Sequence, residues 1–202
     1  MQHLLIVSHP QRRSFTQSVA QTYRGALEAL GHETVVRDLY RLGFDPVLGE
    51  GELPGAKKPV LPAAVRREQR HLAAAGALAL FFPLWWAFMP AMTKGYIDRV
   101  LSLGFAYGFD GDDLIPLLTG KKALVFTSSA ADMAYLRRSK QWQAMRVLER
   151  DHILALCGIE LLEHVHFPSI TPDLSRRSVD RHLERVRRAV EDHWGTAPAP
   201  RG

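Results

Sequence analysis

The stretch 77-ALALFFPLWWAFMPAM-92 decides how this chain folds. The apolar run from Ala77 to Leu84 is typical of a buried central strand. Pro83 to Pro90 suits a loop, and Pro90 fits the first turn of a helix that continues through Ser102. A buried strand followed by a loop and a helix is the repeating unit of an α/β protein.

A longer stretch, Leu72 to Met92, is free of charge over about the length that spans a membrane. Pro83 and Pro90 would break a helix inside it. Trp85 and Trp86 lie near its middle, whereas tryptophans of membrane helices prefer the two ends. We therefore expect no membrane insertion.

The rest of the chain continues the alternation of strands and helices. Further strands are expected at 3-HLLIVS-8, 33-ETVVRD-38, 121-KKALVFTS-128 and 159–167. Helices are expected from the cap at Ser14 to Leu30 with Gly31 as the stop, over 63–75, over 139–156 with Gly158 as the stop, and after Thr171-Pro172. The segments 39–62 and 107–120 are expected to be loops. This order predicts an α/β fold with a five-stranded parallel sheet, helices on both faces and the flavodoxin-like strand order 2-1-3-4-5.

Composition agrees with one globular domain, expected over 1–194 and followed by a flexible tail at 195–202. The 202 residues are 47% hydrophobic and 23% charged. The net charge is +5, and much of the basic charge lies in 175–194. There Val179, Leu183, Val186 and Val190 form an apolar stripe, which predicts a surface helix with a solvated basic face and no nucleic-acid partner. Attraction of anionic ligands is the alternative interpretation.

Cysteine and histidine usage limits the chemistry. Cys157 is the one cysteine, so no disulfide forms within the chain, and its apolar setting predicts a buried thiol. His164 and His166 alternate along an expected strand and should share a face, but further ligands cannot be placed and no metal is expected. The start of the chain lacks a leader pattern, which indicates a cytoplasmic protein.

Ligands of open parallel sheets bind beyond the carboxyl ends of the strands. Three segments lie there: 8-SHPQRRSF-15, 83-PLWWAFMP-90 and 127-TSSAADMAY-135. In the first, a helix start can hold a phosphate with help from hydroxyls and positive charge. The residues that could do so are His9, Ser14, Thr16, Arg12 and Arg13, with Phe15 among them. An ordinary capped turn is the alternative.

The second segment is apolar where a strand-to-helix loop is normally polar. It could form a flat wall for a planar ligand, although aromatic clusters usually belong to a core. In the third, Thr127, Ser128 and Ser129 could bond the polar edge of a ring and Tyr135 adds a phenol, or they could merely cap a strand end. Together the segments suit FMN or FAD. No G-x-G-x-x-G, G-x-x-x-x-G-K-[ST] or G-x-S-x-G motif is present.

At this point the sequence resembles the NAD(P)H dehydrogenase (quinone) family, which includes mammalian quinone reductases and bacterial ancillary proteins of potassium efflux systems. The block 82-FPLWWAFMPAMTKGYIDRVLSLGFAYGF-109 is similar to the family's FPLxW…PA…KG…DRV…GFAY pattern. The stretches 5-LIVSHPQRRSFTQ-17 and 119-TGKKALVFTSSA-130 are similar to two further family segments. The order of elements agrees along nearly the whole chain.

The resemblance implies a role for each matched residue. Flavin contacts fall on His9, Ser14, Phe15, Thr16, Pro83, Leu84, Trp85, Trp86, Ala87, Thr127, Ser128, Ser129, Ala130 and Tyr135. Substrate contacts fall on Phe88, Tyr107 and Phe109, of which the last two would close the pocket of a partner subunit. The catalytic positions are Tyr135 and Gln141. The resemblance further implies a homodimer.

Two departures from the family pattern bear on the site. Ser129 and Ala130 stand where the family has paired glycines, and their side chains could narrow the approach to the flavin or tilt the loop. Gln141 stands where the mammalian members have a histidine, and glutamine cannot store a proton at neutral pH. We therefore do not expect a tyrosine–histidine relay at Tyr135.

The resulting hypothesis is a flavin-dependent NAD(P)H:quinone oxidoreductase. NAD(P)H would give a hydride to the flavin and leave, and a quinone would then enter the same pocket, which is a ping-pong cycle. FAD is the expected cofactor and FMN the alternative. Alternative functions are a redox-sensing ancillary subunit of a potassium efflux transporter, bound peripherally, and an azo- or nitroreductase.

Overall fold

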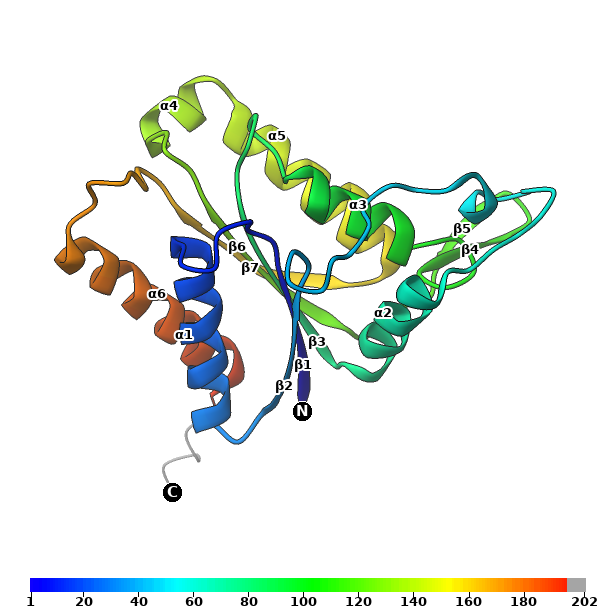
Figure 1. Cartoon of the computed structure of the whole chain (residues 1–202), viewed down its shortest axis with the longest axis horizontal. Helices are drawn as coiled ribbons and strands as arrows, with labels where there is room; N and C mark the ends of the chain where they lie inside the picture. Colours follow the sequence, from blue (N-terminus) through cyan, green and yellow to red (C-terminus); the bar gives the residue numbers. More distant parts are fainter. Residues whose placement is uncertain (196–202) are drawn as a thin grey trace.

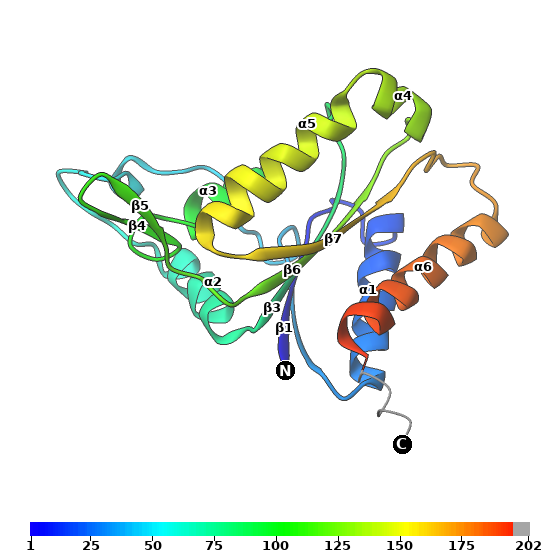
Figure 2. The ribbon, with the colours of Figure 1, turned by 180° about the vertical axis from the view of Figure 1, so that it is seen from behind.

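The computed structural model describes residues 1–195, and a five-stranded parallel sheet forms their centre (Figures 1 and 2). Its strands stand in the order β2 (Glu33–Asp38), β1 (Gln2–Val7), β3 (Ala77–Pro83), β6 (Lys122–Ser128) and β7 (Glu160–Phe167). Counted within this sheet, the order is 2-1-3-4-5, so the predicted topology is confirmed.

Helices cover both faces of the sheet, as predicted. On one face lie α1 (Phe15–Ala29) and α6 (Arg176–Trp194), and on the other lie α2 (Ala63–Ala74) and α3 (Ala91–Val100) (Figures 1 and 2). The strands alternate between the two layers: Leu4 and Ile6 face α2 and α3, whereas Leu5 and Val7 face α1 and α6. Because both faces are covered, the central strands β1, β3 and β6 consist largely of continuous apolar runs.

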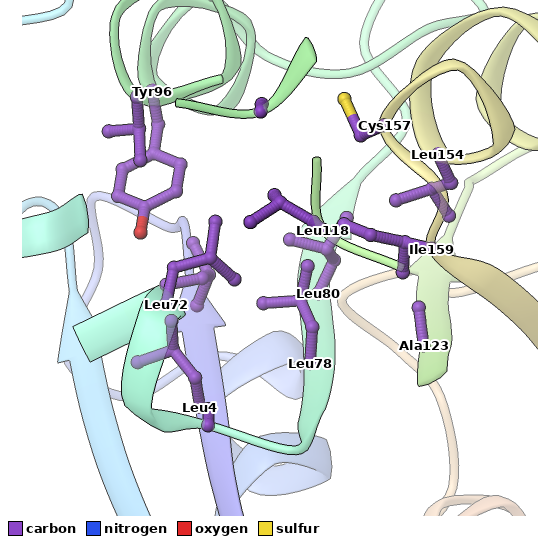
Figure 3. Packing of buried hydrophobic residues seen from close by; sticks show 14 of the residues in the cluster. Leu4, Leu72, Leu78, Leu80, Tyr96, Leu118, Ala123, Leu154, Cys157 and Ile159 are labelled. Carbon is purple, nitrogen blue, oxygen red and sulfur yellow. The ribbon is translucent and has the colours of Figure 1, made fainter. Parts of the chain in front are cut away.

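Figure 3 shows the layer beneath α3, where Leu4, Leu78 and Leu80 pack below Tyr96. Cys157 lies in the same layer and is buried, as expected. Burial raises the pKa of the Cys157 thiol to about 11. At neutral pH this side chain is therefore a small apolar group.

The ends of α1 follow the predicted signals. The Ser14 side chain accepts a hydrogen bond from the Gln17 backbone nitrogen at 3.2 Å, and Gly31 follows the helix with φ of 79°. At the far end of the chain, α6 buries Val186 and Val190 of its predicted apolar stripe. The ring of Trp194 meets the ring of His3 edge-on at 4.8 Å, which joins α6 to the start of β1.

Two predicted loops contain regular structure. The segment 107–120 forms an antiparallel hairpin of β4 (Tyr107–Asp110) and β5 (Asp113–Pro116), which pairs with no strand of the main sheet. The segment 39–62 contains one short 3₁₀ turn, η1 (Glu50–Glu52). Both were predicted as loops because their strands and turns are too short to show a hydrophobic period.

Two predicted helices have different bounds. The expected helix over 139–156 is divided into α5 (Gln141–Val147), the π-helical η2 (Leu148–Leu154) and the 3₁₀ turn η3 (Ala155–Cys157). A short helix, α4 (Met133–Arg138), precedes it, and Lys140 with φ of 60° separates the two.

The prediction that the last helix starts at Thr171-Pro172 was wrong. It starts at Arg176 behind a Ser175 cap, because Thr171 to Leu174 close a turn of their own. Most of the predicted tail at 195–202 lies outside the described residues. Within residues 1–195, no helix is long and apolar enough to cross a membrane.

Candidate functional site

The three segments predicted to build a site meet at the carboxyl ends of β1, β3 and β6, near the start of α1 and near α4 (Figure 1). The Leu84 backbone nitrogen donates to the Ser128 carbonyl oxygen at 2.7 Å, which ties the second segment to the third. The rings of His9 and Trp85 lie 6.2 Å apart, which places the first segment beside the second. The structure thus brings the three predicted loops together, and the surface region that segments 8–15, 83–90 and 127–135 border is the crevice predicted for a ligand.

The start of α1 is suited to an anion. The backbone nitrogens of Phe15 and Thr16 belong to the first turn, whose N–H groups have no partner within a helix. No acidic residue occurs in that turn, so the positive end of the helix dipole is not neutralised by the chain itself. Arg12 and Arg13 are exposed beside it.

His9 stands at the entrance of this loop. Its Nδ1 accepts a hydrogen bond from the Gln11 backbone nitrogen at 3.1 Å. Burial is the largest effect on the ring and lowers the pKa of His9 below its ordinary value. The ring is therefore neutral at pH 7 and offers its other nitrogen as a hydrogen-bond donor.

A tight turn holds the aromatic wall. Trp85 and Phe88 exchange backbone hydrogen bonds of 3.0 and 3.2 Å across it. The two residues between them, Trp86 and Ala87, have φ of 53° and 63°, a left-handed conformation that glycine usually supplies. Trp86 is fully exposed. Non-glycine residues in this conformation are strained, and such strain gathers at ligand-binding sites.

The third segment turns its hydroxyls toward the protein. Thr127, Ser128 and Ser129 are buried and Ala130 is exposed. The Ser129 hydroxyl donates to the Ala131 carbonyl oxygen at 2.8 Å and lies 3.0 Å from His166 Nε2. In this structure the hydroxyl is therefore turned toward β7 and Ala131, although the family pattern has glycine here.

A small pocket joins the first and third segments below the crevice. Its volume is about 10 Å³, and its lining includes Phe15, Thr16, Thr127 and Ser128. That volume is about enough for one water molecule. Phe15 also packs edge-on against Phe167 with ring centroids 5.3 Å apart. These residues form the floor of the site.

The two predicted catalytic residues lie at the edge of the crevice. Tyr135 is on α4 and is 45% exposed, with Arg138 above its ring at 6.0 Å. Gln141 begins α5 and lies beside Leu84 and Ala87 of the second segment. The Gln141 side chain is thus close to the predicted flavin wall.

Tyr107 and Phe109 are not brought to this crevice within one chain. They lie on β4, with ring centroids 6.3 Å apart, and Phe109 is 56% exposed. Tyr107 instead lines a cavity of about 850 Å³ between the loop at 48–61 and the end of α3. No lining residue of that cavity comes from the three segments.

The structure also reveals buried polar residues behind the third segment that were not predicted as site residues. Thr127 Oγ1 lies 2.6 Å from His164 Nε2 and 2.8 Å from His166 Nδ1. Glu149 of η2 lies behind His164. The alternation of His164 and His166 along β7 was the signal that could have identified them, and their expected common face is confirmed. In residues 1–195 no group of three or more metal-ligand side chains is placed to hold an ion.

Comparison with known proteins agrees with this architecture. The family model described as flavodoxin-like fold matches residues 1–192. The chain belongs to the flavodoxin-like fold family. Among relatives within this family, an uncharacterized NAD(P)H oxidoreductase of Haemophilus influenzae is 32% identical over 84% of this chain and 85% of its own.

Two further proteins are similar to this chain over most of their length. NAD(P)H dehydrogenase [quinone] 1 of Rattus norvegicus is 30% identical over 96% of this chain and 78% of its own. The solved structure of NAD(P)H:quinone oxidoreductase from Methanothermobacter marburgensis is 28% identical, with a TM-score of 0.82 over 96% of this chain and 98% of its own. The resemblance seen in the sequence is thereby confirmed.

Proposed function

We propose that this protein is an NAD(P)H:quinone oxidoreductase that uses a bound flavin. The observation that carries the proposal is the meeting of a helix start suited to an anion, an exposed aromatic turn and the loop after β6 at one end of the sheet. The relatives named as NAD(P)H oxidoreductase and as NAD(P)H dehydrogenase [quinone] support the same reaction.

The residues fit a flavin in three parts. The first turn of α1 and Ser14 would hold its phosphate, and the turn at Trp85–Phe88 would cover one face of its ring. The loop after β6 would bond the polar edge of the ring, with Tyr135 nearby. When bound, the flavin would supply hydride transfer from NAD(P)H to a quinone.

The direct test is an absorbance spectrum of the purified protein before and after NADPH is added without oxygen, with the released cofactor identified by mass. Flavin bands that bleach on NADPH would support the proposal, and the mass would separate FAD from FMN. A protein that binds neither flavin, even after reconstitution, would overturn it.

Parallel lines in a two-substrate steady-state plot would support the ping-pong cycle, and intersecting lines would contradict it. A panel of quinones, azo dyes and nitro compounds would identify the acceptor.

Two helix caps provide a matched pair of variants. Ser14 and Ser175 each accept a hydrogen bond from a backbone nitrogen at the start of a long helix, at 3.2 and 3.3 Å. Either serine-to-alanine change should cost about 1 kcal/mol of stability. Only Ser14→Ala should weaken flavin binding, by about tenfold or more, since a hydrogen bond to a charged group is lost.

We also propose that the active form is a homodimer. Exposed apolar side chains gather on the β4–β5 hairpin and just beyond it: Phe109, Leu114, Ile115 and Leu117. A pairing that covers this hairpin would bring Tyr107 and Phe109 to the crevice of the second copy. A monomer by sedimentation at micromolar concentration, with full activity, would contradict this proposal.

A further inference from the structure

A line of five polar side chains runs through the protein behind the predicted flavin site. It begins at Glu149 of η2, passes His164 of β7, Thr127 of β6 and His166 of β7, and ends at Ser129 in the loop after β6. Successive contacts are 2.9, 2.6, 2.8 and 3.0 Å. Thr127 stands opposite His166 in the strand register, so the pairing of β6 with β7 creates the central links.

The line is shielded from water. The side chains of Glu149 and His164 are 3% and 1% exposed, and Ser129 is 9% exposed. The ring of Trp142 covers both histidines, with centroids 4.9 Å from His164 and 5.2 Å from His166.

Two arginines complete the charged surroundings. Arg185 of α6 donates to the His166 carbonyl oxygen at 3.1 Å, and Arg146 of α5 lies 5.8 Å from the Trp142 ring centre. Burial, with smaller effects of His164 and Arg185, lowers the pKa of His166 to about 3. His166 is therefore neutral at pH 7, with one protonated ring nitrogen.

The hydrogen-bond partners assign the direction of each proton. The Ser129 hydroxyl gives its proton to the Ala131 carbonyl oxygen, so it accepts from Nε2–H of His166. Nδ1 of neutral His166 then accepts from the Thr127 hydroxyl. That hydroxyl in turn accepts from Nε2–H of His164. All donors point from Glu149 toward Ser129.

This assignment leaves one proton to be held between His164 and Glu149. Glu149 Oε2 lies 2.9 Å from His164 Nδ1, which is ion-pair distance without hydrogen-bond alignment. Neither oxygen of this carboxyl has an aligned hydrogen-bond partner among the described residues. A bare carboxylate buried in this way is costly, so a proton on one of the two groups is favoured. A rotation of the carboxyl would be needed to align this contact as a hydrogen bond.

We propose that Glu149 and His164 hold a reserve proton, which the line delivers to the Ser129 hydroxyl and from there to a ligand in the crevice. Delivery requires the Ser129 hydroxyl to turn from Ala131 to the ligand. The identity of that ligand as a flavin rests on the proposed function. The existence of the proton line is independent of the proposed function.

The transfer is balanced and moves no electrons. Ser129 gives its proton to the ligand and takes the Nε2 proton of His166, whose Nδ1 takes the Thr127 proton. Thr127 takes the Nε2 proton of His164, and His164 Nδ1 takes the carboxyl proton. Glu149 ends as a carboxylate, and both imidazoles end neutral with the opposite ring nitrogen protonated. Solvent later gives one proton to Ser129, and the same transfers in reverse restore the Nε2–H form of both histidines and the carboxyl proton of Glu149.

The test is ¹⁵N NMR of the imidazole nitrogens in the flavin-free protein as the pH is raised. We expect His164 and His166 to change from the Nε2–H to the Nδ1–H form together, with one midpoint, because the protons of the line move as one set. Glu149→Gln should abolish the change, because an amide cannot supply the proton at the start of the line. Glu163 is an exposed carboxyl on β7, the strand that carries both histidines, and Glu163→Gln should leave the coupled change intact.

Thr127→Val is a second variant of nearly unchanged volume, should Glu149→Gln not fold. It removes the central hydroxyl, so His164 should still respond to pH while His166 should not. Independent responses of the two histidines in the unmodified protein would overturn the proposal, as would an Nδ1–H form of His166 throughout.

Activity supplies a separate measurement on the flavin-loaded protein. Glu149→Gln should lower kcat by about a hundredfold and leave KM for NAD(P)H unchanged, as expected for loss of a proton donor. An unchanged kcat together with an unchanged pH profile would overturn delivery to the ligand. A protein that binds no flavin but shows the coupled tautomer change would overturn the proposed function and leave the proton line standing.

Discussion

Gly95 of α3 lies against the backbone of Pro46, and a Cβ atom on Gly95 would overlap the Pro46 carbonyl oxygen. This contact fastens the long loop between β2 and α2 onto α3. Gly95 is thus required by a close approach of two backbones, and its conformation is ordinary helix.

Gly95→Ala should therefore destabilise the protein by about 1–3 kcal/mol, because backbone atoms must move to admit the methyl group. Gly25→Ala is the matched control: Gly25 lies within α1 and has open space where a Cβ would be. That change should stabilise the protein by about 0.5–1 kcal/mol. Urea unfolding of both variants measures the difference. Equal stability of the two would contradict the assigned role of Gly95.

Trp86 combines full exposure with a left-handed backbone, so its replacement by glycine should separate stability from binding. Trp86→Gly removes about 1 kcal/mol of strain and loses no buried contact, so stability should be unchanged or slightly higher. Flavin affinity should fall, because the apolar wall loses a ring. Trp85→Gly relieves no strain and should lower both. Thermal unfolding and flavin titration measure the two quantities.

His3 makes stability depend on pH. Burial is the main cause that lowers the pKa of His3 to about 4, with smaller contributions from His32 and the N-terminus. Between about pH 6.5 and 4 the unfolded chain binds a proton that the folded protein does not. The contribution of His3 is therefore complete above pH 6.5, and stability falls as the pH is lowered through this window.

The expected loss from His3 is about 1 kcal/mol per pH unit below pH 6. The urea midpoint of the unmodified protein should be lower at about pH 5 than at about pH 7, and this difference should be smaller in His3→Asn. His152→Asn changes an exposed histidine and should leave the dependence as it was. An unaltered slope in His3→Asn would show that His3 is not buried in its neutral form.

Cys157 should be unreactive in the folded protein. Its thiol is 2% exposed, and burial raises its pKa to about 11, so thiolate is scarce at pH 8. A chromogenic disulfide reagent should label one thiol per chain in denaturant and almost none without it. Rapid labelling of the folded protein would indicate that the layer around η3 opens readily.

The sheet could be predicted because its central strands are buried on both faces. Apolar runs such as Leu4 to Val7 and Ala77 to Phe82 are too short for a helix of ordinary length, so they could be assigned as strands. The β4–β5 hairpin was missed because each strand has only four residues. The two residues of its turn, Gly111-Asp112, were the available signal, because Gly111 has a φ of 60° that glycine readily adopts.

The site was predictable in part for a similar reason. Segments such as 83–90 follow strands whose carboxyl ends must lie together in a parallel sheet. The link from Glu149 to Ser129 could not be predicted, because it depends on where η2 packs and on which residue of β7 pairs with Thr127. An irregular step near Ala123 and Leu124 shifts that register, and no local pattern in the sequence specifies it.

The contact between His3 and Trp194 has a practical consequence. It brings the first strand and the last helix together at the amino end of the sheet, opposite the loops that build the crevice. An affinity tag or a fused protein joined directly before β1 or directly after α6 would therefore begin on the side of the sheet away from the crevice. For the same reason, a short linker from the end of α6 to the start of β1 could close the chain into a circle.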